Sequence, residues 1–187
     1  NLSRFAECLI PFIDNDQDKA IELATKIINS FEKKYEEKWL NMMRNKLGLF
    51  GVDEKDKFLI LDLLTWMHQK KVDYTNTFCH LMNVNINGDK NYKDKDFQNW
   101  KMRWDERLKT NNNTPKKCLE LMKTVNPLVI PRNHKVEEAL EEAEKNNLKP
   151  INQLIKVLKD PYSHQKDILD YQIGSNSDEK YQTFCGT

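Results

Sequence analysis

The sequence is poor in the two residues that most often interrupt secondary structure. Its 187 residues include only five glycines and six prolines, and no stretch alternates apolar and polar residues for long enough to predict a strand. β folds generally need more turn residues than this. Charged residues make up 32% of the chain, which is typical of helices with exposed, ion-paired faces. The sequence therefore predicts an all-α fold of about eight helices.

Motifs that bind phosphate are also missing. The glycines never form GxGxxG or GxxxxGK[ST], so no loop offers the consecutive backbone amides that cradle a phosphate. No segment resembles the HRD or DFG motifs, so kinase-type chemistry finds neither its base nor its metal-binding carboxylate here. We therefore predict no catalytic, cofactor-binding or metal site within these residues, and expect any nucleotide site to lie outside this chain.

Cysteine and histidine are sparse and unpatterned. The four cysteines form no CxxC pair, and no histidine shares a helix face with other ligands at metal-binding spacing, which argues against a zinc site. Such cysteine usage fits a reducing compartment, so we expect the cytoplasm, with the mitochondrion as the alternative. These residues are Cys8, Cys79, Cys118 and Cys185, and His68, His80, His134 and His164.

Long apolar runs and an excess of one charge are absent as well. The densest apolar segment, 58–64, is interrupted by Asp62 and is far shorter than the roughly 18–20 residues that span a bilayer. Thirty Lys and Arg residues balance 29 Asp and Glu residues, so neither a nucleic-acid partner nor a membrane partner is predicted. The chain also opens without methionine inside an amphipathic pattern, and we expect it to be part of a longer protein.

The apolar spacing predicts where the helices lie. Between about 16 and 47 the apolar residues recur at helical spacing, and Gly48 follows where a left-handed C-cap is favoured. A second, largely apolar helix is expected from an Asp53 cap to about Lys70, and its apolar residues predict central burial. Further helices are predicted after an Asp73 cap, through 97–108, from Thr114-Pro115, after an Asn133 cap and from Pro150, with an exposed loop over 83–94.

The predicted helices end at Asp160-Pro161. This divides the chain into a helical region, 1–159, and a polar tail, 160–187, which carries Cys185 and is expected to be largely irregular. Free cysteine is usually buried, so a thiol three residues from the end of a polar tail suggests sulfur chemistry. Only Lys180 lies near enough in sequence to lower its pKa, so a reactive thiol and a plain tail residue both remain open.

Two patterns invite a catalytic or binding role but fit a structural role better. The acidic pairs in 137–142 lie opposite the apolar face of Val136, Ala139, Leu140 and Ala143, so we interpret them as a solvated helix face and not as acid–base catalysts. Trp100 and Trp104, interleaved with basic residues, resemble a base-stacking platform. Their spacing with Phe97 and Leu108 favours core anchors.

Six segments, in order, carry a resemblance to a known family. They are Asn1-Leu-Ser-Arg-Phe-Ala-Glu7, Met42-Met-Arg-Asn-Lys-Leu-Gly48, Asp73-Tyr-Thr-Asn-Thr-Phe78, Asn126-Pro127 with 130–140, Asp160-Pro-Tyr162, and Phe184-Cys-Gly-Thr187. Together they resemble the C-terminal part of the selenoprotein O family, also called YdiU, in its cysteine-bearing bacterial form. The chain departs from the family pattern at Cys79, where arginine is usual, and at Lys166, where proline is expected.

The resemblance implies a parent protein with a protein-kinase-like fold that transfers AMP from ATP to protein Ser, Thr or Tyr hydroxyls with magnesium. In that family the nucleotide-binding residues, the base and the metal ligands precede the segment matched here, so none is assigned to a residue of this chain. Cys185 corresponds to the family's terminal redox position, which is proposed to bridge to a cysteine of the catalytic part. The implied partners are the missing N-terminal kinase-like core and the protein substrates.

A second hypothesis comes from another functional class. The chain would then be a stand-alone helical interaction module with a redox-active tail thiol. It would hold a partner through an exposed apolar face of the long helix over 16–47. An open reading frame that continues upstream into kinase-type motifs would favour the first hypothesis, and a stop codon just before Asn1 would favour the second.

Overall fold

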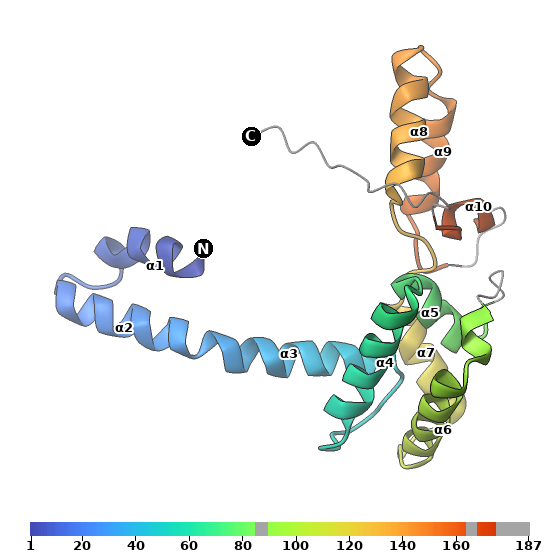
Figure 1. Cartoon of the computed structure of the whole chain (residues 1–187). Helices are drawn as coiled ribbons and strands as arrows, with labels where there is room; N and C mark the ends of the chain where they lie inside the picture. The colour runs from blue at the N-terminus through green and yellow to red at the C-terminus, as the bar shows by residue number, and fades with distance from the viewer. Residues whose placement is uncertain (85–89, 164–167, 175–187) are drawn as a thin grey trace. The chain divides into compact units, whose positions relative to one another are not determined.

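The computed structural model describes residues 1–84, 90–163 and 168–174, and within them every regular element is a helix (Figure 1). The predicted all-α class is confirmed. The α-helices are α1 (Leu2–Leu9), α2 (Gln17–Asn29), α3 (Phe31–Lys46), α4 (Asp56–Lys70), α5 (Tyr74–Leu81), α6 (Lys95–Lys109), α7 (Pro115–Val125), α8 (Asn133–Glu144), α9 (Lys149–Leu158) and α10 (Leu169–Gln172). Two short 3-10 helices, η1 (Ile10–Phe12) and η2 (Lys90–Lys93), precede α2 and α6.

The chain divides into two compact units, Asn1–Met43 and Arg44–Thr187. The division predicted between residues 159 and 160 stays a prediction. Within the predicted tail, the structure adds α10, whose Gln172 is only 1% exposed. No helical period predicts this short helix, because four residues are too few to show one.

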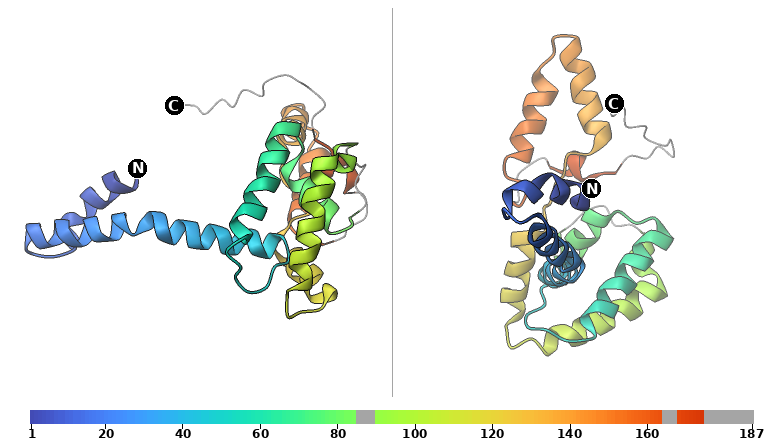
Figure 2. Two further views of the ribbon diagram at one scale, coloured as in Figure 1. Left: turned by 60° about the horizontal axis from the view of Figure 1, so that its bottom comes forward. Right: turned by 90° about the vertical axis from the view of Figure 1, so that its left-hand side faces the viewer.

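The first unit is a helical hairpin followed by the start of α3. Asp16 caps α2 by accepting hydrogen bonds from the amides of Asp18 and Lys19, and α1 and η1 fold back along α2 (Figures 1 and 2). The single helix predicted over 16–47 is wrong in one respect, because α2 ends at Asn29 and α3 begins at Phe31. The Ser30 hydroxyl donates to the Ile27 carbonyl at 2.7 Å, a local bond that competes with helix continuation.

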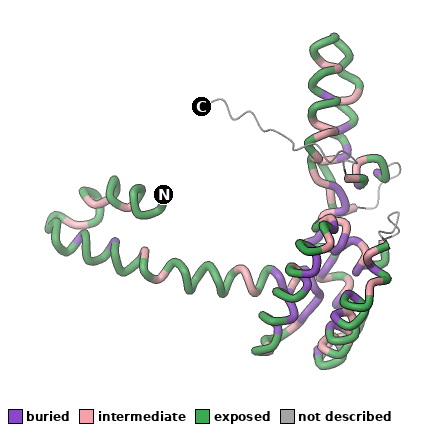
Figure 3. Tube along the Cα trace, viewed as in Figure 1, coloured by how far each residue is buried: buried purple, intermediate pink, exposed green. Residues whose placement is uncertain are grey.

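The second unit has a core of aromatic and aliphatic side chains between α4 and α6. Trp100 and Trp104 are 2% and 5% exposed. Their indole N–H groups donate to the carbonyls of Leu59 and Leu47 at 2.8 and 2.9 Å. Both tryptophans are therefore core anchors, as their spacing predicted. Burial is concentrated in this unit, whereas α1 and α2 are mostly exposed (Figure 3).

The predicted helix caps are partly confirmed. Gly48 has a φ of 68° directly after α3, and Asp73 and Thr114 cap α5 and α7 with side-chain hydrogen bonds. The Asp53 cap is wrong: α4 begins at Asp56, and the Asp53 carboxylate accepts from the amide of Lys55 instead. The Asn133 cap is also wrong, because Asn133 is the first helical residue of α8 and Arg132 is the residue before it.

Helices α8 and α9 form an antiparallel hairpin. Ala139, Leu154 and Val157 are buried, whereas Glu137, Glu138 and Glu141 are exposed, so the interpretation of these three acids as a solvated face is confirmed. The predicted apolar face is wrong at Leu140, which is 46% exposed, and Glu142 is half-buried. None of the helices in the described residues is long and apolar enough to cross a lipid bilayer.

Candidate functional site

A buried carboxylate lies at the first turn of α4. Asp56 has no exposed surface and receives a hydrogen bond from Arg44 Nε at 2.7 Å and another from Arg107 Nε at 2.7 Å. The amide of Asp53 donates to the same carboxylate at 3.0 Å. Because α3 ends, α4 begins and α6 ends around this group, the single carboxylate joins three helices.

The charge of Asp56 is stabilised by these donors. Burial alone would raise the pKa of the Asp56 carboxyl, but the hydrogen bonds from Arg107 and Arg44 outweigh it and hold the pKa below its ordinary value. Arg107 also donates to the Asn111 side chain at 2.7 Å and to the Phe50 carbonyl at 3.1 Å. The Asn111 amide continues the network to the Gly48 carbonyl at 2.9 Å. The network therefore fixes the 48–56 loop against the end of α6.

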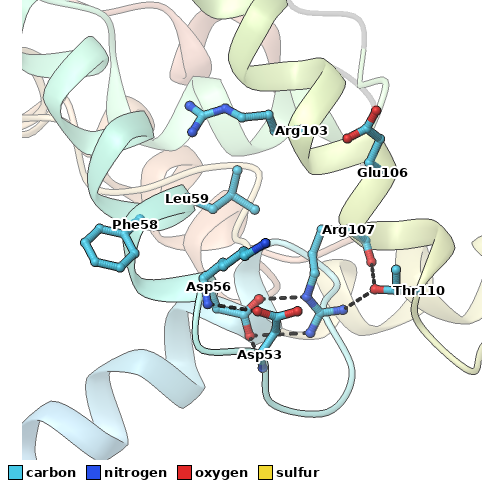
Figure 4. A pocket seen from close by; sticks show the side chains of 9 residues that line it. Asp53, Asp56, Phe58, Leu59, Arg103, Glu106, Arg107 and Thr110 are labelled. Carbon is cyan, nitrogen blue, oxygen red and sulfur yellow. Dashed lines mark hydrogen bonds and ion pairs between the residues drawn. The ribbon is translucent and has the colours of Figure 1, made fainter.

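A pocket of about 410 Å³ opens beside this network (Figure 4). Arg107 lines it but is committed to Asp56, and Arg103 is paired with Asp62 at 2.7 Å. Neither guanidinium is therefore an uncompensated charge for a phosphate. The walls of the pocket also include Asp53, Lys55, Phe58, Leu59, Glu106 and Thr110.

A second polar cluster joins two of the family-like segments. Asp73 caps α5 through the Asn76 amide at 2.8 Å and binds Arg132 with both carboxylate oxygens, at 2.7 and 3.2 Å. The Arg132 side chain is only 9% exposed and also donates to the Asn76 side chain at 3.2 Å. Burial would raise the pKa of the Asp73 carboxyl, but the hydrogen bonds from Arg132 and from the Asn76 amide outweigh burial and hold the pKa below its ordinary value. Arg132 is thus a buried structural guanidinium.

Amide side chains extend this cluster to two further segments. Asn76 Nδ2 donates to the Gln172 carbonyl at 2.9 Å, and Gln172 Nε2 donates to the Leu128 carbonyl at 2.9 Å. Asn126 Nδ2 donates to the Lys46 carbonyl at 2.9 Å. The ends of α3, α7 and α10 and the start of α5 are therefore fastened together by side chain–backbone bonds, which is a bracing role and not an acid–base arrangement.

The cysteines that the structure describes lie in different surroundings. Cys185, the redox residue predicted from the sequence, lies outside the described residues, and its role stays a prediction. Burial raises the pKa of the Cys79 thiol to about 11, so it is protonated at neutral pH, and it donates to the Pro127 carbonyl at 3.6 Å. Cys118 is buried and Cys8 is exposed. Within the described part of the chain, no three His, Cys, Asp or Glu side chains gather to hold a metal ion.

The sequence reasoning missed the Asp56 network. Asp56 and Arg107 lie 51 positions apart, and no local period links them. The one available signal was Arg44, which belongs to the family-like segment 42–48.

Comparison with known proteins agrees with the segment resemblance. The family model described as "Protein adenylyltransferase SelO" matches residues 1–159. Proteins named "Protein nucleotidyltransferase YdiU" from Pelagibacter ubique, Alcanivorax borkumensis and Clostridium perfringens strain SM101 are 54%, 46% and 42% identical over the whole of this chain. The chain spans 39%, 39% and 38% of these relatives' lengths. With most of its length matched by one family model, the chain belongs to the protein adenylyltransferase SelO family.

Proposed function

We propose that this chain is the C-terminal helical part of a magnesium-dependent protein adenylyltransferase of the cytoplasm. The longer protein transfers AMP from ATP to Ser, Thr or Tyr hydroxyls of other proteins. The observation that carries the proposal is the family match over 1–159, together with a chain that spans 39% of its relatives. The role of these residues is to brace the kinase-like catalytic part, which lies in the remaining portion of the polypeptide.

We expect ATP and magnesium to bind outside the residues of this chain. The pocket beside Asp56 is lined by arginines that already have carboxylate partners, and Asp56 itself is enclosed between two guanidinium groups. We therefore assign no step of AMP transfer to the side chains of this chain.

Calorimetry with ATP and magnesium tests this assignment. We expect the isolated 187-residue chain to show no binding heat and to transfer no label from α-³²P-ATP to a protein mixture. The full gene product that contains it is expected to transfer the label. Saturable ATP binding by the isolated chain would overturn the assignment, as would a full gene product that transfers none.

For Cys185 we propose a redox role in the longer protein. Its thiol and a cysteine thiol of the catalytic part would form a disulfide, giving two electrons and two protons to a small-molecule disulfide that is reduced to two thiols. We expect a Cys185→Ser variant of the full gene product to lose one disulfide-linked peptide in mass spectrometry after treatment with oxidised glutathione. An unchanged peptide map would reject this role.

One observation favours a second candidate function. The first unit exposes large apolar side chains along α1 and α2, as an interaction module would. In this alternative the chain is a stand-alone helical module with a redox-active tail thiol. Sequencing upstream of Asn1 separates the two, because only the enzyme hypothesis requires kinase-type motifs in the same reading frame.

A further inference from the structure

Large apolar side chains lie in two stripes of the first unit. On α1 and η1 they recur at i, i+3, i+7 and i+10, which places Leu2, Phe5 and Leu9 on one side of α1. On α2 and α3 they recur at i, i+4 and i+8, which places Phe31 and Tyr35 on one side of α3. Phe31 and Tyr35 stack with ring centroids 6.0 Å apart. We call this set the apolar ledge: Leu2, Phe5, Leu9, Phe12, Ile27, Phe31 and Tyr35.

The ledge is not covered by its own unit. The hydrophobic side chains buried within Asn1–Met43 are Ala20, Ala24 and Met43. Ala20 and Ala24 lie on α2, against which α1 and η1 pack, and their small size lets the helices approach closely. The same stripe of α2 then continues to Ile27, which is 63% exposed. The hairpin therefore buries small residues between its own helices and leaves its large apolar side chains exposed.

The size of the ledge matches a protein interface. Phe5, Phe12 and Tyr35 are 61%, 86% and 60% exposed. With side chains of these sizes, the ledge presents on the order of 800 Å² of apolar surface. The largest apolar patch on a typical monomer is about 300–600 Å², whereas one partner of a stable interface contributes about 800 Å².

We infer that the apolar ledge is the surface on which the rest of the same polypeptide docks. The inference rests on the proposed function and names the partner of this unit. The chain spans only 39% of its relatives, so a larger part of the polypeptide is available as a permanently tethered partner. Because the rest of the polypeptide is covalently linked to this unit, its effective concentration at the ledge is high, and it can keep the apolar side chains covered.

Hydrogen exchange tests the inference directly. The amides of α1 and α2 are compared in the isolated 187-residue chain and in the full gene product that contains it. We expect exchange at least tenfold slower in the full product, because covering the ledge suppresses local opening. Equal exchange in the two proteins would overturn the inference. So would an isolated chain that is dimeric by light scattering and already protected at α1 and α2, because a second copy would then be the occupant.

Substitutions in the full gene product locate the docking surface. We expect Phe5→Asp and Ile27→Asp each to restore fast exchange in α1 and α2. The matched control is Phe58→Asp on α4, a phenylalanine that is 67% exposed compared with 61% for Phe5. We expect this control to leave α1 and α2 protected. If it exposes them as much as Phe5→Asp does, the effect is not specific to the ledge and the inference fails.

A parallel labelling assay separates this inference from the proposed function. Transfer of label from α-³²P-ATP by a full gene product whose α1 and α2 exchange rapidly would reject the docking surface and keep the enzyme assignment. Slow exchange without any transfer would reject the enzyme assignment and keep the docking surface.

Discussion

The two units of this chain cover their apolar side chains in opposite ways. Arg44–Thr187 encloses Phe78, Phe97, Ile60 and Leu63 almost completely. Asn1–Met43 buries two alanines and a methionine and exposes most of its large apolar residues. Both units are helical, so helix content does not separate a self-supporting unit from a dependent one. The separating property is where the large apolar side chains lie.

Polar contacts follow the same division. In the second unit, buried guanidinium groups and indoles tie distant segments together, as in the contact between Arg107 and Asp56 across 51 positions. In the first unit, Arg4 pairs with Glu7 and Lys19 pairs with Asp14, which are neighbours in the sequence. Contacts between distant segments hold a fold together, whereas exposed local pairs contribute about 0–1 kcal/mol.

The largest expected effect is the removal of the buried carboxylate. Asp56→Ala removes the buried carboxylate that accepts hydrogen bonds from Arg44 and Arg107, and breaking a buried pair in this way costs about 3–5 kcal/mol. Urea unfolding followed by tryptophan fluorescence measures the loss, since Trp100 and Trp104 report on this core. The control is Asp62→Ala, which breaks a half-exposed pair with Arg103 and is expected to cost less than about 1 kcal/mol. Equal costs for the two variants would contradict the bracing role of Asp56.

Lowering the pH should reduce the stability lost in Asp56→Ala. The folded-state pKa of Asp56 is depressed below the ordinary value of 3.8, so its contribution is complete above that value and is lost as pH falls through the folded pKa. We therefore expect the stability difference between the unchanged protein and Asp56→Ala to be constant from pH 7 to 5 and to shrink below pH 4. Each unit of depression corresponds to about 1.4 kcal/mol. Unfolding curves at pH 7, 5, 4 and 3 measure it, and a difference that grew on acidification would have the wrong sign.

Arg132→Lys is expected to have a smaller effect. Lysine keeps the charge but cannot bind both oxygens of Asp73 and the Asn76 side chain at once. We expect a loss of about 1–2 kcal/mol in urea unfolding. Arg103→Lys, at a pair whose side chains are 52% and 50% exposed, is the matched control and should change stability by less than about 0.5 kcal/mol. Equal losses of stability in Arg132→Lys and Arg103→Lys would show that the bidentate contact with Asp73 adds no stability.

The smallest effect is expected in the first unit. Ile27→Ser in the isolated chain removes an already exposed side chain and should change stability by less than about 0.5 kcal/mol. Leu63→Ala, at a fully buried position, is expected to cost about 2–5 kcal/mol under the same conditions. A large cost for Ile27→Ser would mean that the isolated chain buries this residue, and the contrast between the units would fail.

Local sequence signals predicted much of the helical fold. Gly48 after a periodic apolar stretch, the Asp73 cap and Thr114-Pro115 all act through neighbours within four residues, and the structure confirms them. Asp53 and Asn133 failed because several nearby positions offer a similar cap, and tertiary contacts decided between them. The amide of Asp53 donates to the Asp56 carboxylate in the loop before α4, and the N-cap of α4 lies two residues onward, at Lys55.

The clusters around Asp56 and Asp73 could not be predicted from residues that are close in sequence. Nothing in the neighbourhood of Asp73 shows that Arg132, 59 positions away, will bind it, and only the family-like segments containing both residues marked them as important. The break at Ser30 was missed because the apolar periodicity continues through this residue. Periodicity does not report the hydrogen bond that the Ser30 hydroxyl donates to the Ile27 carbonyl. The redox role of Cys185 was predicted from its position in a polar tail and from the family resemblance, and Cys185 lies outside the described residues.

Limited proteolysis of the isolated 187-residue chain tests the contrast between the units most directly. Trypsin sites are available in both: Lys26, Lys33 and Lys34 in the first, and Lys57, Lys101 and Arg103 in the second. We expect the first-unit sites to be cut at least tenfold faster than the second-unit sites, because only the second unit encloses a core of its own. Cleavage of α4 and α6 as fast as α2 and α3, read by mass spectrometry, would contradict it.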